Sequence, residues 1–185
     1  MSIGPVVNLP TFRFHPDPIR SGSIIESKAK CRCCKKARGW IYTGPVYAEE
    51  ELNDALCPWC IADGSAHEKF DATFVDSEAF GENTSDAVLT EITERTPGFN
   101  AWQSERWPAC CGEAAAFVTP AGIREIREQF PKLEGTLMTF IVQEMGISGG
   151  AARQTLESLR SDQSPTAFIF KCLHCDAHPV YVDSL

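Results

Sequence analysis

The stretch from Cys31 to Cys60, CRCCKKARGWIYTGPVYAEEELNDALCPWC, decides how the first third of the chain folds. A Cys-x-x-Cys pair stands at each end, and 22 residues separate Cys34 from Cys57. Two such pairs at this kind of spacing are typical of a zinc site, because four thiolate sulfurs must reach one tetrahedral ion at about 2.3 Å. We therefore expect one structural Zn²⁺ here, bound by Cys31, Cys34, Cys57 and Cys60.

Two other interpretations of these cysteines are open. A thioredoxin-like redox motif would suit Cys57-Pro58-Trp59-Cys60, but that motif follows a βαβ unit and the preceding sequence shows none. Unreactive thiols that pack as small hydrophobic side chains are the other interpretation. Cys33 also lies in the first pair, but only Cys31 and Cys34 have the usual two-residue spacing. We therefore expect Cys33 to take no part in metal binding.

A third Cys-x-x-Cys pair, Cys172 and Cys175, stands near the C-terminus between two β-prone segments. Apart from Cys33, the only remaining cysteines are the neighbours Cys110 and Cys111, far upstream. The pattern predicts a second zinc site, so that each chain holds two ions, with buried thiols as the alternative. Neighbouring residues seldom bind one ion together, which leaves the fourth ligand beside Cys111, Cys172 and Cys175 open. The candidates are Cys110, His174 and His178.

The formal net charge of −8 is unevenly distributed along the chain. Residues 1–44 carry +6, residues 45–94 carry −12 and residues 95–185 carry −2. An acidic surface attracts basic proteins and repels nucleic acid. The sequence therefore predicts a protein-binding surface on an acidic helix, with a merely solvated helix face as the simpler alternative. The densest acidic residues are Glu49, Glu50, Glu51 and Asp54.

A basic cluster crowds the first cysteine pair and favours a different function. Basic residues interleaved with aromatic ones suit contact with a nucleic-acid backbone and stacking on bases. The first alternative function is therefore a zinc-ribbon module that contacts nucleic acid or a transcription complex, although the acidic net charge disfavours it. The basic residues are Lys28, Lys30, Arg32, Lys35, Lys36 and Arg38, and Trp40 and Tyr42 follow them.

The hydrophobic periodicity and the turn residues predict an α+β fold. A small zinc-ribbon or treble-clef-like unit comes first, and a helical part closed by a cysteine-knuckle β-hairpin follows it. We expect these units at residues 1–78 and 79–185, with a polar linker at 76–85; one compact domain is the alternative. Strands are expected at 11–15, 23–30, 40–43, 166–171 and 180–183, and helices at 47–56, 61–70, 85–96, 121–130, 133–145 and 148–160.

The sequence offers little support for catalysis. The chain contains no G-x-S-x-G and no H-E-x-x-H, and its glycines at 146–150 do not follow a strand as a phosphate loop would. His15 and His67 are expected to be surface or capped histidines. We therefore predict that the protein is not an enzyme. A metal-dependent enzyme that uses the C-terminal Cys and His residues is the second alternative function.

Nothing in the sequence predicts contact with a membrane. The most apolar stretch, 137–142, is followed at once by Gln143 and Glu144, and no window of about 20 residues is apolar enough to span a bilayer. The first 20 residues lack the basic and apolar regions of a secretory signal. A reducing cytosol also suits metal-binding Cys-x-x-Cys pairs. We therefore expect a cytoplasmic protein.

Four blocks of this sequence resemble the CbrC family. They are LPTFRFHPDPIRSGSI at 9–24, CRCCKKARGWIYTGPVYAEEELNDALCPWCIADGSAHEKFDATFVD at 31–76, TPGFNAWQSERWPACCGEAAAF at 96–117 and FIFKCLHCDAHPVYVD at 168–183. The resemblance covers nearly the whole chain. It implies that seven cysteines occupy the family's positions: Cys31, Cys34, Cys57, Cys60, Cys111, Cys172 and Cys175. Members of that family often have His at the position of Cys110 and Cys at that of Ala115, so the fourth ligand of the second site stays open.

The resemblance also implies a function. The named member of the CbrC family is associated with tolerance of a DNase-type colicin under the control of a two-component system. A DNase toxin has a basic, phosphate-binding cleft, which an acidic surface attracts. We therefore expect a non-enzymatic zinc protein that acts by binding another protein, for which a basic nuclease toxin is the implied candidate.

Overall fold

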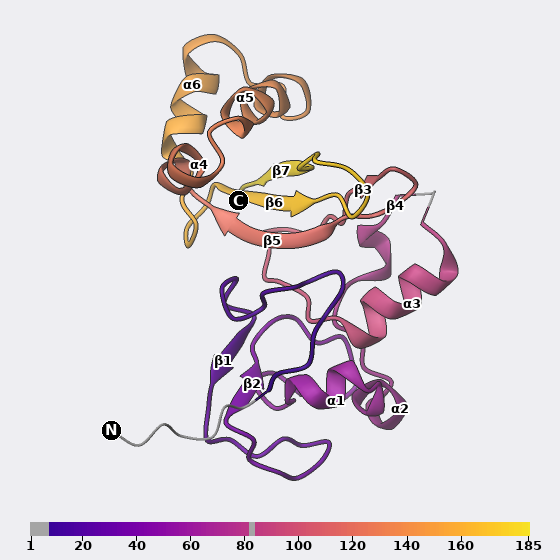
Figure 1. Cartoon of the computed structure of the whole chain (residues 1–185). Coiled ribbons are helices and arrows are strands. Elements are labelled where there is room, and N and C mark those ends of the chain that lie inside the picture. Colours follow the sequence, from indigo (N-terminus) through magenta and orange to yellow (C-terminus); the bar gives the residue numbers. More distant parts are fainter. Residues whose placement is uncertain (1–7, 82–83) are drawn as a thin grey trace.

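The computed structural model describes residues 8–81 and 84–185. Within these ranges, six α-helices and one 3₁₀ helix accompany seven strands, which form three small antiparallel sheets. The predicted α+β class is therefore confirmed. Figure 1 shows the N-terminal elements at the bottom, a three-stranded sheet above them, and a group of helices at the top.

The N-terminal part is built on a hairpin and two short helices. Strand β1 (Ile24–Glu26) pairs with β2 (Trp40–Tyr42), and α1 (Pro58–Ala62) and α2 (Ser65–Phe70) lie beside them (Figure 1). Gly64, with φ of 81°, separates the two helices where the sequence predicted one. Because a left-handed residue ends a helix, the single helix expected over 61–70 is wrong.

The position of the first cysteine pair differs from the predicted order. The zinc-ribbon interpretation placed a knuckle before a hairpin, whereas residues 31–34 lie inside the connection from β1 to β2. The strand predicted at 11–15 is also absent from the described residues; this segment runs as irregular chain. Its Phe14 carbonyl nevertheless accepts a 2.7 Å hydrogen bond from the Phe117 N–H, which ties the segment to the edge of the large sheet.

The acidic helix predicted at 47–56 is wrong. The segment is an extended loop, held at one end by a bridge between Tyr47 and Thr73 and at the other by a bridge between Leu56 and Tyr42. Leu52 and Leu56 are both buried, and their four-residue spacing imitates a helix. Asp54 takes a left-handed turn conformation, with φ of 53°, which Asp tolerates better than most residues. The two ends of the segment therefore find backbone partners at Thr73 and at Tyr42 of β2 rather than within a helix.

The middle of the chain leads into the second half. The predicted linker at 76–85 contains the 3₁₀ helix η1 (Ser77–Ala79), and its residues 82–83 lie outside the described residues. Helix α3 (Asp86–Arg95) confirms the helix predicted at 85–96. The side chain of Ser85 makes no capping hydrogen bond, although the residue stands at the N-cap.

The large sheet has the order β5-β6-β7. Its strands are β5 (Ala116–Ala121), β6 (Thr166–Lys171) and β7 (Val180–Asp183). A small hairpin of β3 (Ala109–Cys110) and β4 (Glu113–Ala114) precedes it. The sequence predicted β6 and β7 at their observed bounds. It missed β5 because Pro120 lies inside it, which an edge strand tolerates since one side of its backbone needs no partner.

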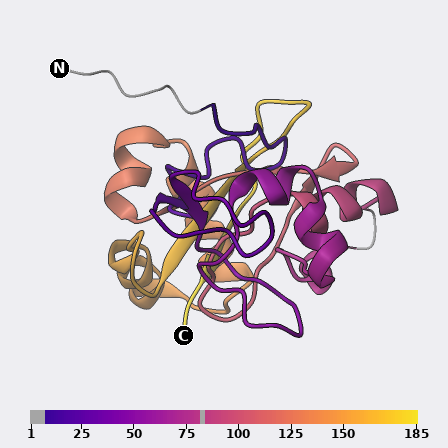
Figure 2. The ribbon, with the colours of Figure 1, turned by 90° about the horizontal axis from the view of Figure 1, so that it is seen from below.

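Both faces of this sheet are covered. Phe168 and Phe170 of β6 pack with Phe99 and Trp107 on one face, whereas Ala167 and Ile169 face a cluster on the other side. Helices supply that second cluster: α4 (Ile123–Gln129), α5 (Leu133–Gln143) and α6 (Gly149–Ser158). All three lie within two residues of the predicted helices at each end. Figure 2 shows them on the opposite side of the molecule from α1–α3.

Among the described residues, the buried hydrophobic side chains form a core with three parts. The N-terminal part draws its buried residues from 12–74, and the part next to α4–α6 draws its own from 121–182. Between them, the middle part combines Phe14 and Val75 with the aromatic residues of the large sheet. The N-terminal segment thus contributes to two parts of the core. The division at residue 78 stays a prediction.

Candidate metal centres

Four cysteine sulfurs of the N-terminal part meet at one point. We call Cys31, Cys34, Cys57 and Cys60 the N-terminal cluster; their sulfurs all lie within 4.8 Å of one another. The Sγ–Sγ distances are 3.9 Å for Cys31–Cys60, 3.8 Å for Cys34–Cys57 and 3.6 Å for Cys57–Cys60. Sulfurs at about 2.3 Å from a tetrahedral zinc stand about 3.8 Å apart, whereas a disulfide is about 2.05 Å long. The cluster therefore has the dimensions of an S₄ metal site.

The backbone around Cys31 is folded to present its sulfur. The Lys35 N–H donates to the Cys31 carbonyl at 2.8 Å, and the Cys31 N–H donates to the Lys36 carbonyl at 3.0 Å. Lys35 closes this turn in a left-handed conformation, with φ of 61°. Cys57 is the N-cap of α1, and its N–H donates to Cys31 Sγ at 3.3 Å. Pro58 fits the first helical position, where its missing N–H costs nothing.

The negative charge of the thiolates in the N-terminal cluster requires a bound cation to offset it. A hydrogen bond from the Cys57 side chain lowers the pKa of Cys31 to about 4, whereas the same bond and burial raise the pKa of Cys57. Cys31, Cys57 and Cys60 are buried and Cys34 is half-buried, so four thiolates held here without a counter-ion would be strongly destabilising. Cys33 stays outside the group of four, with its sulfur 3.6 Å from Ser65 Oγ.

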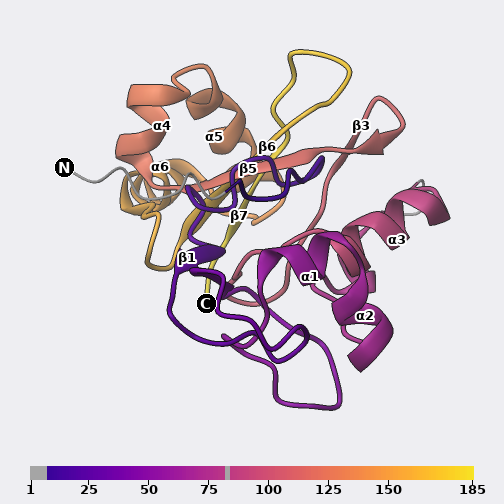
Figure 3. The ribbon, with the colours of Figure 1, turned by 60° about the horizontal axis from the view of Figure 1, so that its bottom comes forward.

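A second group of four sulfurs forms between segments that are distant in sequence. We call Cys110, Cys111, Cys172 and Cys175 the C-terminal cluster; their sulfurs also lie within 4.8 Å of one another. The Sγ–Sγ distances are 3.9 Å for Cys110–Cys111, 3.8 Å for Cys110–Cys175 and 3.7 Å for Cys111–Cys175. These too are the spacings of a tetrahedral S₄ site. The β3–β4 turn and the β6–β7 connection supply the cysteines (Figures 1 and 3).

A tight turn explains how neighbouring cysteines reach one point. Cys110 pairs with Glu113, so Cys111 and Gly112 form the two-residue loop of the β3–β4 hairpin. Both have positive φ, 54° and 80°, which is the pattern of a type I′ turn. In a regular strand, neighbouring side chains point to opposite faces, and the left-handed residue removes this alternation. The turn therefore brings the sulfurs of both neighbouring cysteines into one group of four, and the Cys-Cys-Gly sequence is the local signal for such a turn.

The two histidines offered as fourth ligands make other contacts. His174 Nε2 lies 2.6 Å from Glu113 Oε2, and His178 Nδ1 lies 3.1 Å from the Asp176 carbonyl oxygen. The His174 N–H donates to Cys172 Sγ at 3.4 Å and lowers the pKa of that thiol to about 6. Cys110 thus occupies the place in the sulfur group that the sequence left open. His174 instead supports the site through its backbone and through Glu113.

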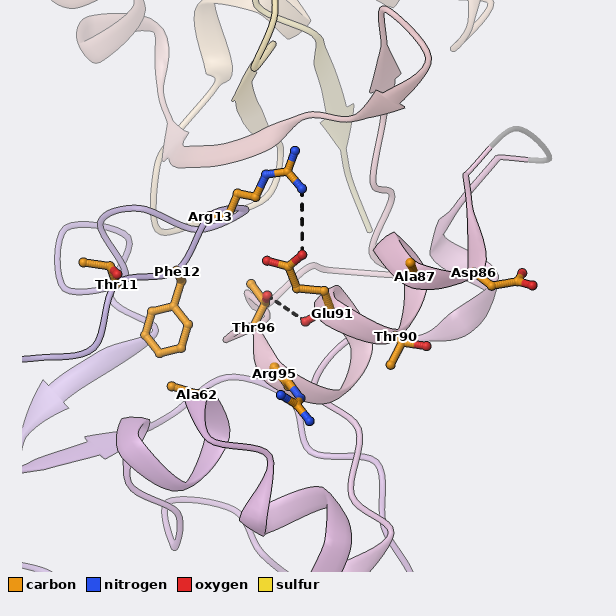
Figure 4. Close-up of a pocket in the computed structure, with 10 residues that line it drawn as sticks. All are labelled: Thr11, Phe12, Arg13, Ala62, Asp86, Ala87, Thr90, Glu91, Arg95 and Thr96. Atoms are coloured by element: carbon orange, nitrogen blue, oxygen red, sulfur yellow. Dashed lines mark hydrogen bonds and ion pairs between the residues drawn. The ribbon is translucent and has the colours of Figure 1, made fainter.

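Ionic contacts of Arg13 connect the β3–β4 hairpin to a cavity beside α3. Arg13 lies 2.6 Å from Glu113 and 3.8 Å from Glu91 of α3. The cavity, of about 630 Å³, lies between the segment 11–13, α1 and α3 (Figure 4). Arg13 and Glu91 face each other across it in the close-up. The residues described around it include neither cysteine nor histidine, so the cavity does not supply the metal ligands.

The acidic and the basic residues near the N-terminal cluster are in contact. Arg32 lies 2.6 Å from a Glu50 carboxylate oxygen and donates at 2.7 Å to the Glu51 carbonyl. We call the exposed residues Glu49, Glu50, Glu51 and Asp54 the acidic loop. Within the basic cluster, the Arg38 guanidinium stacks 5.1 Å from the centre of the Trp59 ring. The knuckle and the acidic loop thus neutralise each other in part.

The sequence did not predict that two ionisable residues, His15 and Glu105, are buried. His15, expected near the surface, is completely buried, with Nδ1 2.7 Å from the Pro97 carbonyl and Nε2 2.7 Å from Ser21 Oγ. Burial lowers its pKa to about 4, so it is neutral at pH 7. Glu105 accepts hydrogen bonds from the Tyr47 hydroxyl and the Asp76 N–H, and burial raises its pKa to about 7. Both residues join sequence-distant parts of the chain, which no local pattern reveals.

The chain is similar to proteins of several bacteria. It is 43% identical over 178 residues to UPF0167 proteins of Mycobacterium bovis and Mycobacterium tuberculosis, covering 95% of this chain and 93% of each relative. It is 41% identical over 169 residues to a UPF0167 protein of Pseudomonas aeruginosa, covering 90% and 92%. No solved structure matches the chain. Among the described helices, none has the length and apolar character to cross a bilayer. The model of the uncharacterised protein family UPF0167 matches residues 9–184, and the chain belongs to this family.

Proposed function

We propose that the protein is a non-enzymatic binding protein whose fold is held by two structural zinc ions. The observation that carries this proposal is the composition of both clusters, each of which brings together four cysteine sulfurs. A catalytic zinc keeps one coordination position for water or substrate, whereas four thiolates fill a tetrahedral site. One feature of the N-terminal unit is consistent with a treble clef: the pair Cys31 and Cys34 lies next to the start of α1, where Cys57 stands. The pair lies inside the β1–β2 connection, however, and not before the hairpin.

Zinc is the ion that suits these sites best. Tetrahedral S₄ groups bind zinc or iron, and a structural zinc ion needs no redox partner. Metal analysis of the purified protein should find two zinc ions per chain in a colourless solution. Clearly fewer than two zinc ions per chain, or a coloured iron protein, would contradict the proposal.

The partner we propose is a basic protein that docks on the acidic loop. Three of its residues, Glu49, Glu51 and Asp54, are exposed, and their carboxylates are left outside the pair that Glu50 makes with Arg32. The loop is fixed at both ends by β-bridges and lies beside the N-terminal cluster, so little ordering is needed on binding. The resemblance to the CbrC family suggests a DNase-type toxin, whose basic cleft complements such a surface.

A charge-reversal variant tests this partner. Glu49→Lys, Glu51→Lys and Asp54→Lys together should leave zinc content unchanged, because the three side chains are exposed, and should lower the melting temperature only slightly, because Lys at position 54 must adopt a left-handed conformation. Association with a basic DNase domain, measured by surface plasmon resonance, should become at least tenfold slower and lose most of its salt dependence. The matched control carries the same charge change far from the loop, at the exposed Glu128, Glu144 and Asp162. Equal binding by both variants would remove the acidic loop from the proposal.

The two alternative functions receive less support. Arg32 is already paired with the acidic loop and Arg38 with Trp59, so part of the basic cluster is used within the molecule. This disfavours the nucleic-acid module, for which a salt-dependent shift of DNA or RNA would be the positive result. His174 is engaged with Glu113 rather than held open beside a metal, which disfavours the C-terminal metal enzyme.

A further inference from the structure

We propose that the C-terminal cluster is an oxidation site. Two-electron oxidants such as hydroperoxides react with its exposed thiolates, form a disulfide and release the zinc ion, while the N-terminal cluster keeps its own. This inference rests on the proposed function, because it requires zinc in both clusters. Its substrate class is a small oxidant that donates an electrophilic oxygen.

The two clusters share their chemistry but differ in access to solvent. In the N-terminal cluster, Cys31, Cys57 and Cys60 are buried and Cys34 is half-buried. In the C-terminal cluster, only Cys172 is buried, Cys110 is half-buried, and the other two members are exposed. Oxidation of cysteine follows thiolate character and exposure. Because zinc keeps all eight sulfurs as thiolates, exposure alone separates the two clusters.

The surroundings strengthen this difference. The buried sulfurs of the N-terminal cluster belong to a hydrophobic core part that includes Leu56 and Ile61, so an oxidant reaches them only if that core opens. The C-terminal cluster instead lies between a two-residue turn and a connecting loop. Its backbone N–H donor, from His174, serves the buried Cys172. Cys111 and Cys175 therefore supply the solvent-exposed nucleophilic sulfurs of this cluster.

The reaction balances with a hydroperoxide as the oxidant. Cys111 Sγ attacks the distal peroxide oxygen, so that an S–O bond forms, the O–O bond breaks, and the departing alkoxide takes a proton to become an alcohol. Cys175 Sγ, 3.7 Å away, then attacks the oxidised sulfur; the S–S bond forms, and hydroxide leaves and takes a proton to become water. Two thiolates lose two electrons, and the peroxide gains two. Cys110 and Cys172 alone do not complete a tetrahedral site, so the zinc ion leaves.

The experiment uses the zinc-loaded full chain in a Cys33→Ser background, which removes a thiol outside both clusters. Hydrogen peroxide is added in steps, and released zinc is followed with a chromogenic chelator. We expect one zinc ion per chain to leave and one to remain at moderate peroxide. Non-reducing peptide mapping should place the new disulfide among Cys110, Cys111, Cys172 and Cys175. Reduction followed by zinc should restore the second ion.

The outcomes separate this inference from the proposed function. If the untreated protein holds fewer than two zinc ions, the proposed function fails first and the oxidation site fails with it. If it holds two ions and peroxide releases neither, or both at the same rate, two structural zinc sites stand and the oxidation site is overturned. A disulfide mapped to Cys31, Cys34, Cys57 or Cys60 at moderate peroxide would also overturn it.

Discussion

The two cysteine clusters reach nearly the same sulfur geometry from opposite starting points. The N-terminal cluster is assembled within 30 residues, and three of its four cysteines are part of a hydrophobic core. The C-terminal cluster joins a tight turn to a loop that follows more than 50 residues later, and two of its cysteines are exposed. The comparison teaches that the same group of four cysteines occurs in two settings: one cluster lies within a hydrophobic core, and the other joins two surface segments.

The largest expected effect comes from the buried cluster. Cys57→Ser removes a buried sulfur of the N-terminal cluster but keeps a good N-cap residue at the start of α1, so the loss of metal binding alone should cost the N-terminal unit its zinc ion and unfold it. Zinc binding in small zinc-dependent units contributes of order 10 kcal/mol to folding, which is comparable to the whole free energy of unfolding of a typical domain. Zinc analysis and circular dichroism would measure the loss. Cys33→Ser is the matched control and should leave both signals unchanged.

A smaller effect is expected at the exposed cluster. Cys111→Ser should remove one zinc ion per chain but leave the large sheet folded, because the aromatic residues on its face pack without the cluster. We expect a fall in melting temperature of several degrees, well short of the unfolding caused by Cys57→Ser. If Cys111→Ser unfolds the chain as completely as Cys57→Ser, the distinction between a core cluster and a surface fastener is wrong.

Sequence patterns predicted local structure better than long-range structure. All four cysteines of the N-terminal cluster were named, because both pairs follow local Cys-x-x-Cys turns. Only three of the C-terminal cluster were fixed, because the place of Cys110 depends on the left-handed turn at Cys111. The helices α4–α6 were placed within two residues, since their periodicity is local.

The errors arose where tertiary contacts overrule local preference. The buried Leu52 and Leu56 have helical spacing, yet β-bridges to Tyr42 and Thr73 hold their segment extended. The two bridges pair positions that are distant in sequence, so no local window contains their signal. Burial of His15 has the same origin, because its partner Pro97 stands 82 positions away.

The contact that Glu105 makes with Tyr47 and Asp76 should make the stability of the protein depend on pH. Glu105 accepts hydrogen bonds from Tyr47 and Asp76, and burial raises its pKa from 4.5 to about 7. The folded protein therefore binds this proton more tightly, and the contribution of Glu105 to stability is full below pH 4.5 and lost as pH rises through 7. Glu105→Gln keeps the shape without the charge. Its stability relative to the unmodified chain should rise by roughly 1–3 kcal/mol between pH 4.5 and 8.

Urea unfolding at several pH values would measure this difference. His15, whose pKa is lowered to about 4, works in the opposite direction, since the neutral form is favoured by folding and stability rises with pH from 4 to 6.5. It is present in both proteins and cancels from the difference between them. If the difference in unfolding free energy between the two proteins does not change with pH, burial does not raise the pKa of Glu105 and this prediction is wrong.

The smallest expected effect sharpens the account of how the exposed cluster is built. Gly112 has φ of 80° in the two-residue turn, and a Cβ added there would meet no atom within 4 Å. Gly112→Ala therefore costs only backbone strain, about 1 kcal/mol, and zinc affinity at the C-terminal cluster should fall about fivefold. Gly135→Ala in α5 is the matched control. A Cβ added at Gly135 would also meet no atom within 4 Å, but this glycine is helical, so alanine should stabilise the helix. Competition with a chelator, read for each cluster separately, decides the matter: a fall at the N-terminal cluster, or none at the C-terminal one, would mean that the left-handed turn does not position Cys110 and Cys111.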